Sequence, residues 1–104
     1  MDAMASPILA CNIQAIGAAE RPRYRELVSR LRSAILDREE LADGYGYSLD
    51  SANIIPLEVA EWIALERLCC PFLNFELDAC RLTMRGPEGT KAVLREEFAV
   101  SQVW

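Results

Sequence analysis

The sequence predicts a small two-layer α+β domain, in which about three helices cover an antiparallel sheet in the order β-α-β-α-β-β-α. Apolar residues recur at helical spacing in some segments and alternate as in strands in others, and Gly or Pro residues separate these segments. Apolar residues make up 52% of the 104, enough for one core, so we expect a single domain over residues 1–104.

The elements of the first half follow from local patterns. Ile8 to Ile16 alternates weakly, which is typical of a half-buried strand, with an irregular arm as the alternative. Arg21 to Leu41 carries one apolar stripe at three- and four-residue spacing, and Pro22 fits only its first turn, so a helix is expected there. Asp43-Gly44 predicts a turn, and Tyr45 to Leu49 alternates as a short strand.

The second half predicts a helix, a hairpin and a last helix. The helix spans Leu57 to Cys69 and must end at Pro71, because the residue before a proline is pushed out of the α region. It is apolar nearly all round, so we expect it to be buried. Residues 72–77 and 82–85 predict two strands joined by a turn at 78–81, and residues 90–100 predict the last helix.

Charge and composition exclude several classes of function. A net charge of -5 without a clustered basic face argues against binding nucleic acid or an anionic membrane. No apolar run reaches transmembrane length, and the first ten residues lack the features of a signal peptide. We therefore expect a cytoplasmic protein whose four cysteines are reduced.

The chain contains no histidine. Ser-His-Asp and Cys-His catalysis and His-ligated zinc or haem are therefore excluded. Any acid-base chemistry must use Glu, Asp, Lys, Tyr or Cys.

The adjacent thiols Cys69 and Cys70 are the most distinctive chemical feature. Their spacing is not that of a zinc or redox motif, but the change of direction at Pro71 can bring both sulfurs toward one point. Two thiolates suit a thiophilic ion such as Cu(I) or Hg(II), whereas zinc would need further ligands from Glu66, Cys11 or a second subunit.

Glu66 is expected on the same broad face of the helix as Trp62 and Cys70. A buried carboxylate without a partner is costly. Three explanations remain open: an ion pair with an arginine such as Arg21 or Arg85, a functional carboxylate beside the thiols, or an exposed position.

Three functions are compatible with these residues. The leading hypothesis is binding of a soft metal or metalloid ion by Cys69 and Cys70, with Glu66 as ligand or base and Cys11 as a further candidate ligand.

The second hypothesis is a small enzyme that acts on a small molecule. Cys70 would be its nucleophile and Glu66 its acid or base, although the negative end of a helix disfavours a reactive thiol. The residues expected to line its pocket are Trp62, Tyr45, Tyr47 and Arg67. The third hypothesis is a non-catalytic module, expected to be a homodimer, whose cysteines are structural.

The run Ala60 to Leu77 resembles a family of small bacterial proteins. Their common core reads W-x-x-L-E-R-x-C-C-P-F-x-x-F, and the likeness extends to Asp43-Gly44-Tyr45 upstream and to residues 86–89 downstream. The resemblance implies no particular activity. It marks Glu66, Arg67, Cys69 and Cys70 as the positions that match the core string.

Overall fold

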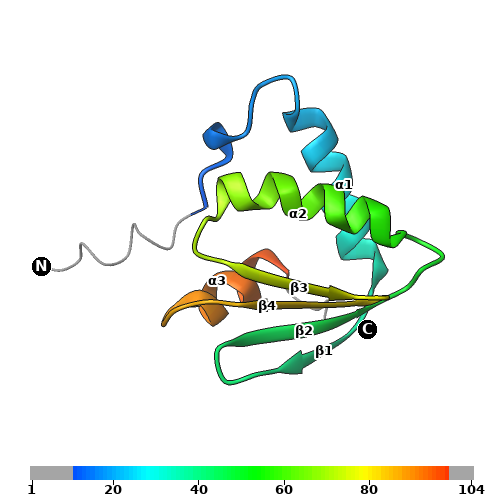
Figure 1. The fold of residues 1–104 in the computed structure, drawn as a ribbon, viewed down its shortest axis with the longest axis vertical. Helices are drawn as coiled ribbons and strands as arrows, with labels where there is room; N and C mark the ends of the chain where they lie inside the picture. The colour runs from blue at the N-terminus through cyan, green and yellow to red at the C-terminus, as the bar shows by residue number, and fades with distance from the viewer. Residues whose placement is uncertain (1–10, 99–104) are drawn as a thin grey trace, which may run out of the picture.

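The computed structural model describes residues 11–98 and confirms the α+β class (Figure 1). A 3-10 turn, η2 (Ile13–Ala15), precedes three helices and a four-stranded antiparallel sheet. The elements after η2 are, in chain order, α1 (Arg21–Ala34), β1 (Ile35–Glu40), β2 (Gly44–Leu49), α2 (Pro56–Cys69), β3 (Asn74–Asp78), β4 (Arg81–Arg85) and α3 (Thr90–Glu97).

The sheet has the strand order β1-β2-β4-β3, with every neighbouring pair antiparallel. In the centre of the sheet Tyr47 lies opposite Leu82, and Leu82 lies opposite Leu77. Because side chains alternate between the two faces of a strand, these residues share one face. The opposite face carries polar and charged partners such as Glu76 and Thr83.

The helices pack on the apolar face of the sheet, and their contacts form the core. Trp62 of α2 meets Phe75 of β3 and Phe98 edge to face, with ring centroids 5.7 and 5.6 Å apart. Phe98, just after α3, also contacts Tyr47 of β2, at 6.1 Å between ring centroids. These aromatic contacts join α2, the residue after α3 and the sheet in one core.

Two predicted elements of the first half differ from the structure. The helix expected to reach Leu41 ends at Ala34, and residues 35–40 form β1 instead. Pairing with β2 across the Asp43-Gly44 turn supplies this segment with backbone hydrogen bonds. These stabilise the strand more than the helical preference of the segment stabilises a helix. Of the strand predicted at residues 8–16, positions 11–16 contain η2, and positions 8–10 lie outside the described residues.

The elements from residue 44 onward confirm the prediction closely. The strand at β2, the helix α2 and the β3–β4 hairpin lie where they were expected. The hairpin turn places Ala79 in the left-handed region, at φ 54°, and Gly89 has φ 97° at the start of α3. The last helix is described as far as Glu97, and residues 99–100 of its predicted span lie outside the described residues.

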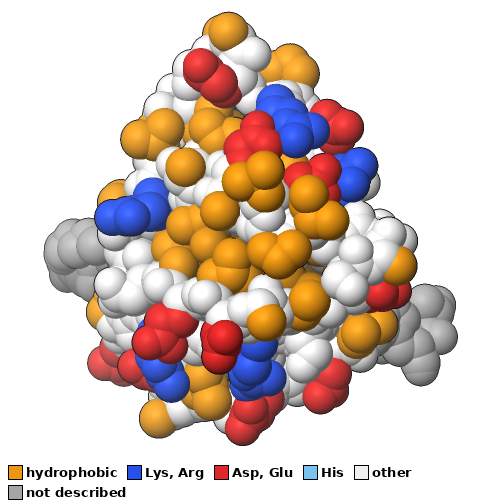
Figure 2. Space-filling model, turned by 45° about the vertical axis from the view of Figure 1, so that its right-hand side comes forward, with side chains coloured by type: hydrophobic (Ala, Val, Ile, Leu, Met, Phe, Trp, Pro, Cys, Tyr) orange, Lys and Arg blue, Asp and Glu red, His pale blue; other side chains and the backbone are white. Residues whose placement is uncertain are grey.

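Helix α2 is not buried all round, contrary to the sequence prediction. One side faces the core, but Leu57 is 76% and Leu68 53% exposed, and Ala60 and Ala64 between them are also exposed. We call these four residues the outer side of α2. Figure 2 shows apolar side chains gathered at the mid-height of the molecule, with charged side chains above and below them. Within residues 11–98, no helix is both long enough and apolar enough to cross a membrane.

Candidate functional site

The chain turns sharply at the C-terminal end of α2, so that Cys69 lies inside the helix and Cys70 just beyond it. Cys69 is the last helical residue, and Cys70 leaves the α region with φ -127° and ψ 74°, as Pro71 requires. The Cys70 amide still donates to the Glu66 carbonyl at 2.7 Å, which closes the helix. Both cysteines are buried, and their sulfur atoms lie 3.9 Å apart. The expected convergence of the two thiols is therefore present.

The N-terminal segment adds a third cysteine to this point. The Asn12 amide donates to the Cys69 carbonyl at 2.9 Å, satisfying one of the carbonyls left free at the helix end. Cys11, next to Asn12, forms a disulfide with Cys70. The expectation that all four cysteines are reduced is therefore wrong for this pair, because a backbone contact between distant segments brings the two sulfurs together. Cys69 and Cys80 are free thiols.

Cys69 is a buried thiol with a raised pKa. Burial, together with the negative charges of the nearby carboxylates of Glu66 and Glu97, raises the pKa of the Cys69 thiol to about 11. Its neutral thiol is therefore the dominant form at neutral pH. A cation that binds the sulfur must displace this proton.

Glu66 is fully buried, at 0% exposure, and no arginine of residues 11–98 pairs with it. The Tyr24 hydroxyl of α1 donates to Glu66 Oε1 at 2.6 Å. The ion pair considered from the sequence is not formed, because Arg21 donates to the Ile16 carbonyl and Arg85 pairs with Asp43 and Glu76. Burial, together with the negative charge of Glu97, raises the pKa of Glu66 to about 7.

The second carboxyl oxygen of Glu66, Oε2, is buried and has no hydrogen-bond partner within the described part of the chain. Buried polar atoms are nearly always paired, so an unpaired oxygen indicates a proton, a water or a cation as its partner.

Glu97 at the end of α3 brings a second carboxylate to the same place. The Cys11 sulfur lies 3.8 Å from Glu97 Oε1, and Arg32 of α1 donates to the Glu97 carbonyl at 3.0 Å. Burial raises the pKa of Glu97, and the charge of Arg32 opposes this rise.

These side chains form two overlapping sets of metal-ligand atoms. The sulfurs of Cys11, Cys69 and Cys70 all lie within 4.8 Å of one another, and we call this set the sulfur triangle. One ligand atom each from Cys11, Cys70, Glu66 and Glu97 also lies within 4.8 Å of the others, and we call this the mixed set. Cys69 belongs only to the first set, and the carboxylates belong only to the second.

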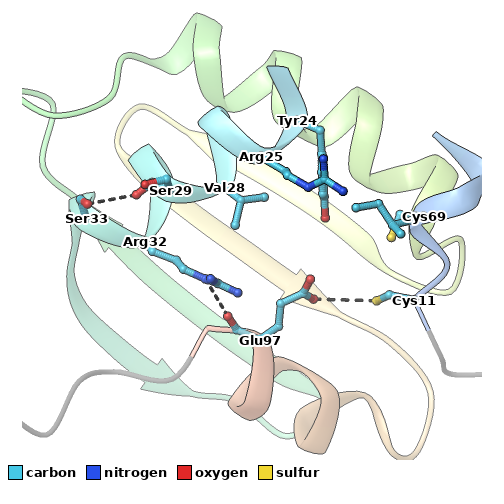
Figure 3. A pocket seen from close by; sticks show the side chains of 10 residues that line it. Cys11, Tyr24, Arg25, Val28, Ser29, Arg32, Ser33, Cys69 and Glu97 are labelled. Carbon is cyan, nitrogen blue, oxygen red and sulfur yellow. Dashed lines mark hydrogen bonds between the residues drawn. The ribbon is translucent and has the colours of Figure 1, made fainter. Parts of the chain in front are cut away.

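A cavity of about 570 Å³ opens beside the sulfur triangle (Figure 3). Its volume is in the usual range of small-molecule sites. Cys11 and Cys69 line one end, and Glu97 is directed toward Cys11. The rest of the lining comes mainly from one side of α1, namely Tyr24, Arg25, Val28, Ser29, Arg32 and Ser33, together with Ile13. Cys70 is fully buried behind this cavity, at 0% exposure.

The four residues predicted to line a pocket do not line this cavity. Trp62, Tyr45 and Tyr47 are buried in the core, where their rings pack against other aromatic or cationic side chains. Arg67 is exposed on α2 and borders a separate hollow next to β3. The three aromatic residues that were expected to line a pocket are instead part of the packed core.

Tyr24 and Glu97 are functional candidates that the sequence patterns did not identify. Tyr24 belongs to the apolar stripe of the first helix, and its position there predicts only a core residue. Glu97 falls at helical spacing from the buried residues Thr90 and Leu94, which was the available signal.

Comparison of the chain with family models, curated proteins and solved structures found no match. The resemblance noted from the sequence therefore stays a prediction, and the function must be inferred from the geometry of the site.

Proposed function

We propose that the reduced protein binds a thiophilic metal or metalloid ion through Cys69 and Cys70, with Cys11 beside them. The observation that carries this proposal is the sulfur triangle, whose three atoms lie within 4.8 Å of one another. Two of its residues, Cys11 and Cys69, line the end of a cavity. Soft thiolate ligands select thiophilic ions. The absence of histidine from the chain leaves sulfur and carboxylate as the main ligand types.

The disulfide between Cys11 and Cys70 makes this function dependent on redox state. A bonded sulfur pair cannot supply thiolates, so the oxidised protein offers only Cys69. Reduction by a small thiol or a phosphine frees the other two sulfurs. Ion binding then competes with reformation of the disulfide.

The chemistry of Cys69 favours ion binding over nucleophilic catalysis. A catalytic thiol needs a lowered pKa, whereas burial raises the pKa of Cys69 to about 11. A thiophilic ion displaces thiol protons by forming strong bonds to sulfur, so a raised pKa lowers its affinity without preventing binding.

The direct test is titration of the reduced protein with Hg(II) or Cu(I) against a competing chelator, under nitrogen. We expect one ion per chain in the reduced protein and much weaker binding before reduction. The double variant Cys69→Ser/Cys70→Ser should lose this binding. Cys80→Ser is the matched control, because Cys80 lies in the β3–β4 turn and belongs to neither ligand set. Equal affinity of the double variant and the parent would refute the proposal.

A further inference from the structure

The sulfur triangle and the mixed set predict different ions, because they differ in charge. Three thiolates carry three negative charges, so a trivalent centre gives a neutral complex. A divalent ion in the same triangle gives a complex with one net negative charge. In the mixed set, with all four ligands ionised, a divalent ion gives a complex with two net negative charges.

Burial makes this difference decisive. Cys69 and Cys70 are each at most 3% exposed and Cys11 is part-buried, so a net charge on the complex is largely removed from water. A buried net charge is costly unless it is paired. The nearest carboxylates, Glu66 and Glu97, would repel a negative complex rather than stabilise it.

The cavity supplies the geometry that a trivalent metalloid prefers. Trivalent arsenic and antimony bind three sulfurs on one side and keep a lone pair on the other, so they need three ligands and an open fourth direction. Cys11 and Cys69 meet the end of the cavity, and Cys70 lies behind them. Arsenous acid is small and uncharged at neutral pH, so it can enter such a cavity without a compensating charge.

We propose that the sulfur triangle binds a trivalent metalloid such as arsenic(III) through all three of Cys11, Cys69 and Cys70. This inference rests on the proposed function, and specifies its ion class and its third ligand. Three As–O bonds of arsenous acid are replaced by three As–S bonds. Each thiol proton leaves with one hydroxyl group as water, and arsenic stays trivalent. Glu66 and Glu97 stay outside the triangle.

Arsenite titration of the reduced protein, with the reductant removed under nitrogen, tests this inference. Native mass spectrometry should show one arsenic per chain and the loss of three protons, and sulfur-to-arsenic charge-transfer absorption should appear in the ultraviolet. We expect Cys69→Ser to weaken arsenite binding by at least about 100-fold, and Glu66→Gln to change it by less than about tenfold.

Cys69→Ser is the sharper variant because Cys69 stands outside the disulfide, so its oxidised form can be checked for folding by circular dichroism. Cys11→Ser gives a second test with a different expectation. It should lose the trivalent metalloid and keep Hg(II), which needs only the two thiolates of Cys69 and Cys70. Cys80→Ser should behave as the parent.

The outcomes separate this inference from the proposed function. If Hg(II) binds but arsenite does not, or if Cys11→Ser keeps its arsenite affinity, the metalloid inference is wrong and the proposed function stands. If Zn(II) binds instead, is lost in Glu66→Gln and is kept in Cys69→Ser, the mixed set is the site and the inference is also wrong. If no thiophilic ion binds the reduced protein, both fail.

Discussion

Each side of helix α2 holds residues that are unexpected for a surface helix. The inner side buries the carboxylate Glu66 beside Trp62 and Cys69, all at most 3% exposed. The outer side exposes Leu57 and Leu68, at 76% and 53%. A helix that only had to cover a sheet would expose Glu66, as it exposes Glu61, and would bury Leu57 and Leu68.

Stability alone does not explain why the inner side of α2 buries the carboxyl group of Glu66. A buried carboxyl group with one unpaired oxygen destabilises the fold, and the one donor that Glu66 has within residues 11–98, the Tyr24 hydroxyl, offsets only part of that effect. Polar groups kept in a core at a cost to stability are common in functional sites. Glu66 adjoins the thiols and the cavity, which agrees with such a role.

The largest expected effect comes from breaking the disulfide that joins Cys11 to Cys70 at the end of α2. The Cys11–Cys70 bond closes a loop with a sequence separation of 59 residues, so its removal should lower the free energy of unfolding by about 4 kcal/mol. Urea unfolding of the parent with and without reductant measures this difference. Cys11→Ser should match the reduced parent and should not respond to reductant. A parent whose unfolding is unaffected by reductant would show that the bond does not constrain the chain.

Neutralising Glu66 should have the next largest effect, and one that depends on pH. The pKa of Glu66 is about 7 in the folded protein against an ordinary 4.5, so the folded state holds this proton more tightly than the unfolded chain. The stability that protonated Glu66 contributes is full below pH 4.5 and is lost as the pH rises to about 7. Over that range the loss amounts to roughly 3 kcal/mol.

Glu66→Gln should remove this part of the pH dependence, and urea unfolding at several pH values between 4 and 8 measures it. The control is Glu61→Gln, because Glu61 is an exposed carboxylate of the same helix that pairs with Arg23. Parallel stability profiles for Glu66→Gln and the parent would contradict the raised pKa.

The smallest effect is expected on the outer side. Leu68→Ser should change the free energy of unfolding by less than about 0.5 kcal/mol, because the side chain is half exposed and outside the core. Sedimentation of the same variant tests the homodimer predicted from the sequence. If that dimer uses the outer side of α2, Leu68→Ser should shift the protein to monomer. A large loss of stability in the isolated chain would instead place Leu68 in a core.

Much of the second half of the fold could be predicted from local signals. The span of α2, the stop at Pro71 and the β3–β4 hairpin each depend on spacing, proline geometry or turn residues within a few positions. The grouping of Glu66, Cys69 and Cys70 followed in the same way, since residues one helical turn apart share a face.

The first half shows where local signals are insufficient. Residues 35–40 have helical spacing and many helix-forming residues, yet they form β1, because pairing with β2 satisfies their backbone groups. Such pairing depends on where the partner strand lies, and the spacing of apolar residues within one segment does not predict that position.

The amino-acid sequence by itself determined the fold class and excluded histidine chemistry. It also identified the segment from Glu66 to Pro71 as the candidate functional segment. Only the tertiary structure decided that Cys11 bonds to Cys70, that Tyr24 rather than an arginine holds Glu66, and that Glu97 joins the site. The physical reason is sequence separation. Helix spacing and proline act within a few residues, whereas contacts between segments 40 to 90 residues apart arise only when the helices pack on the sheet, as the separations of 42, 59 and 86 residues at this site show.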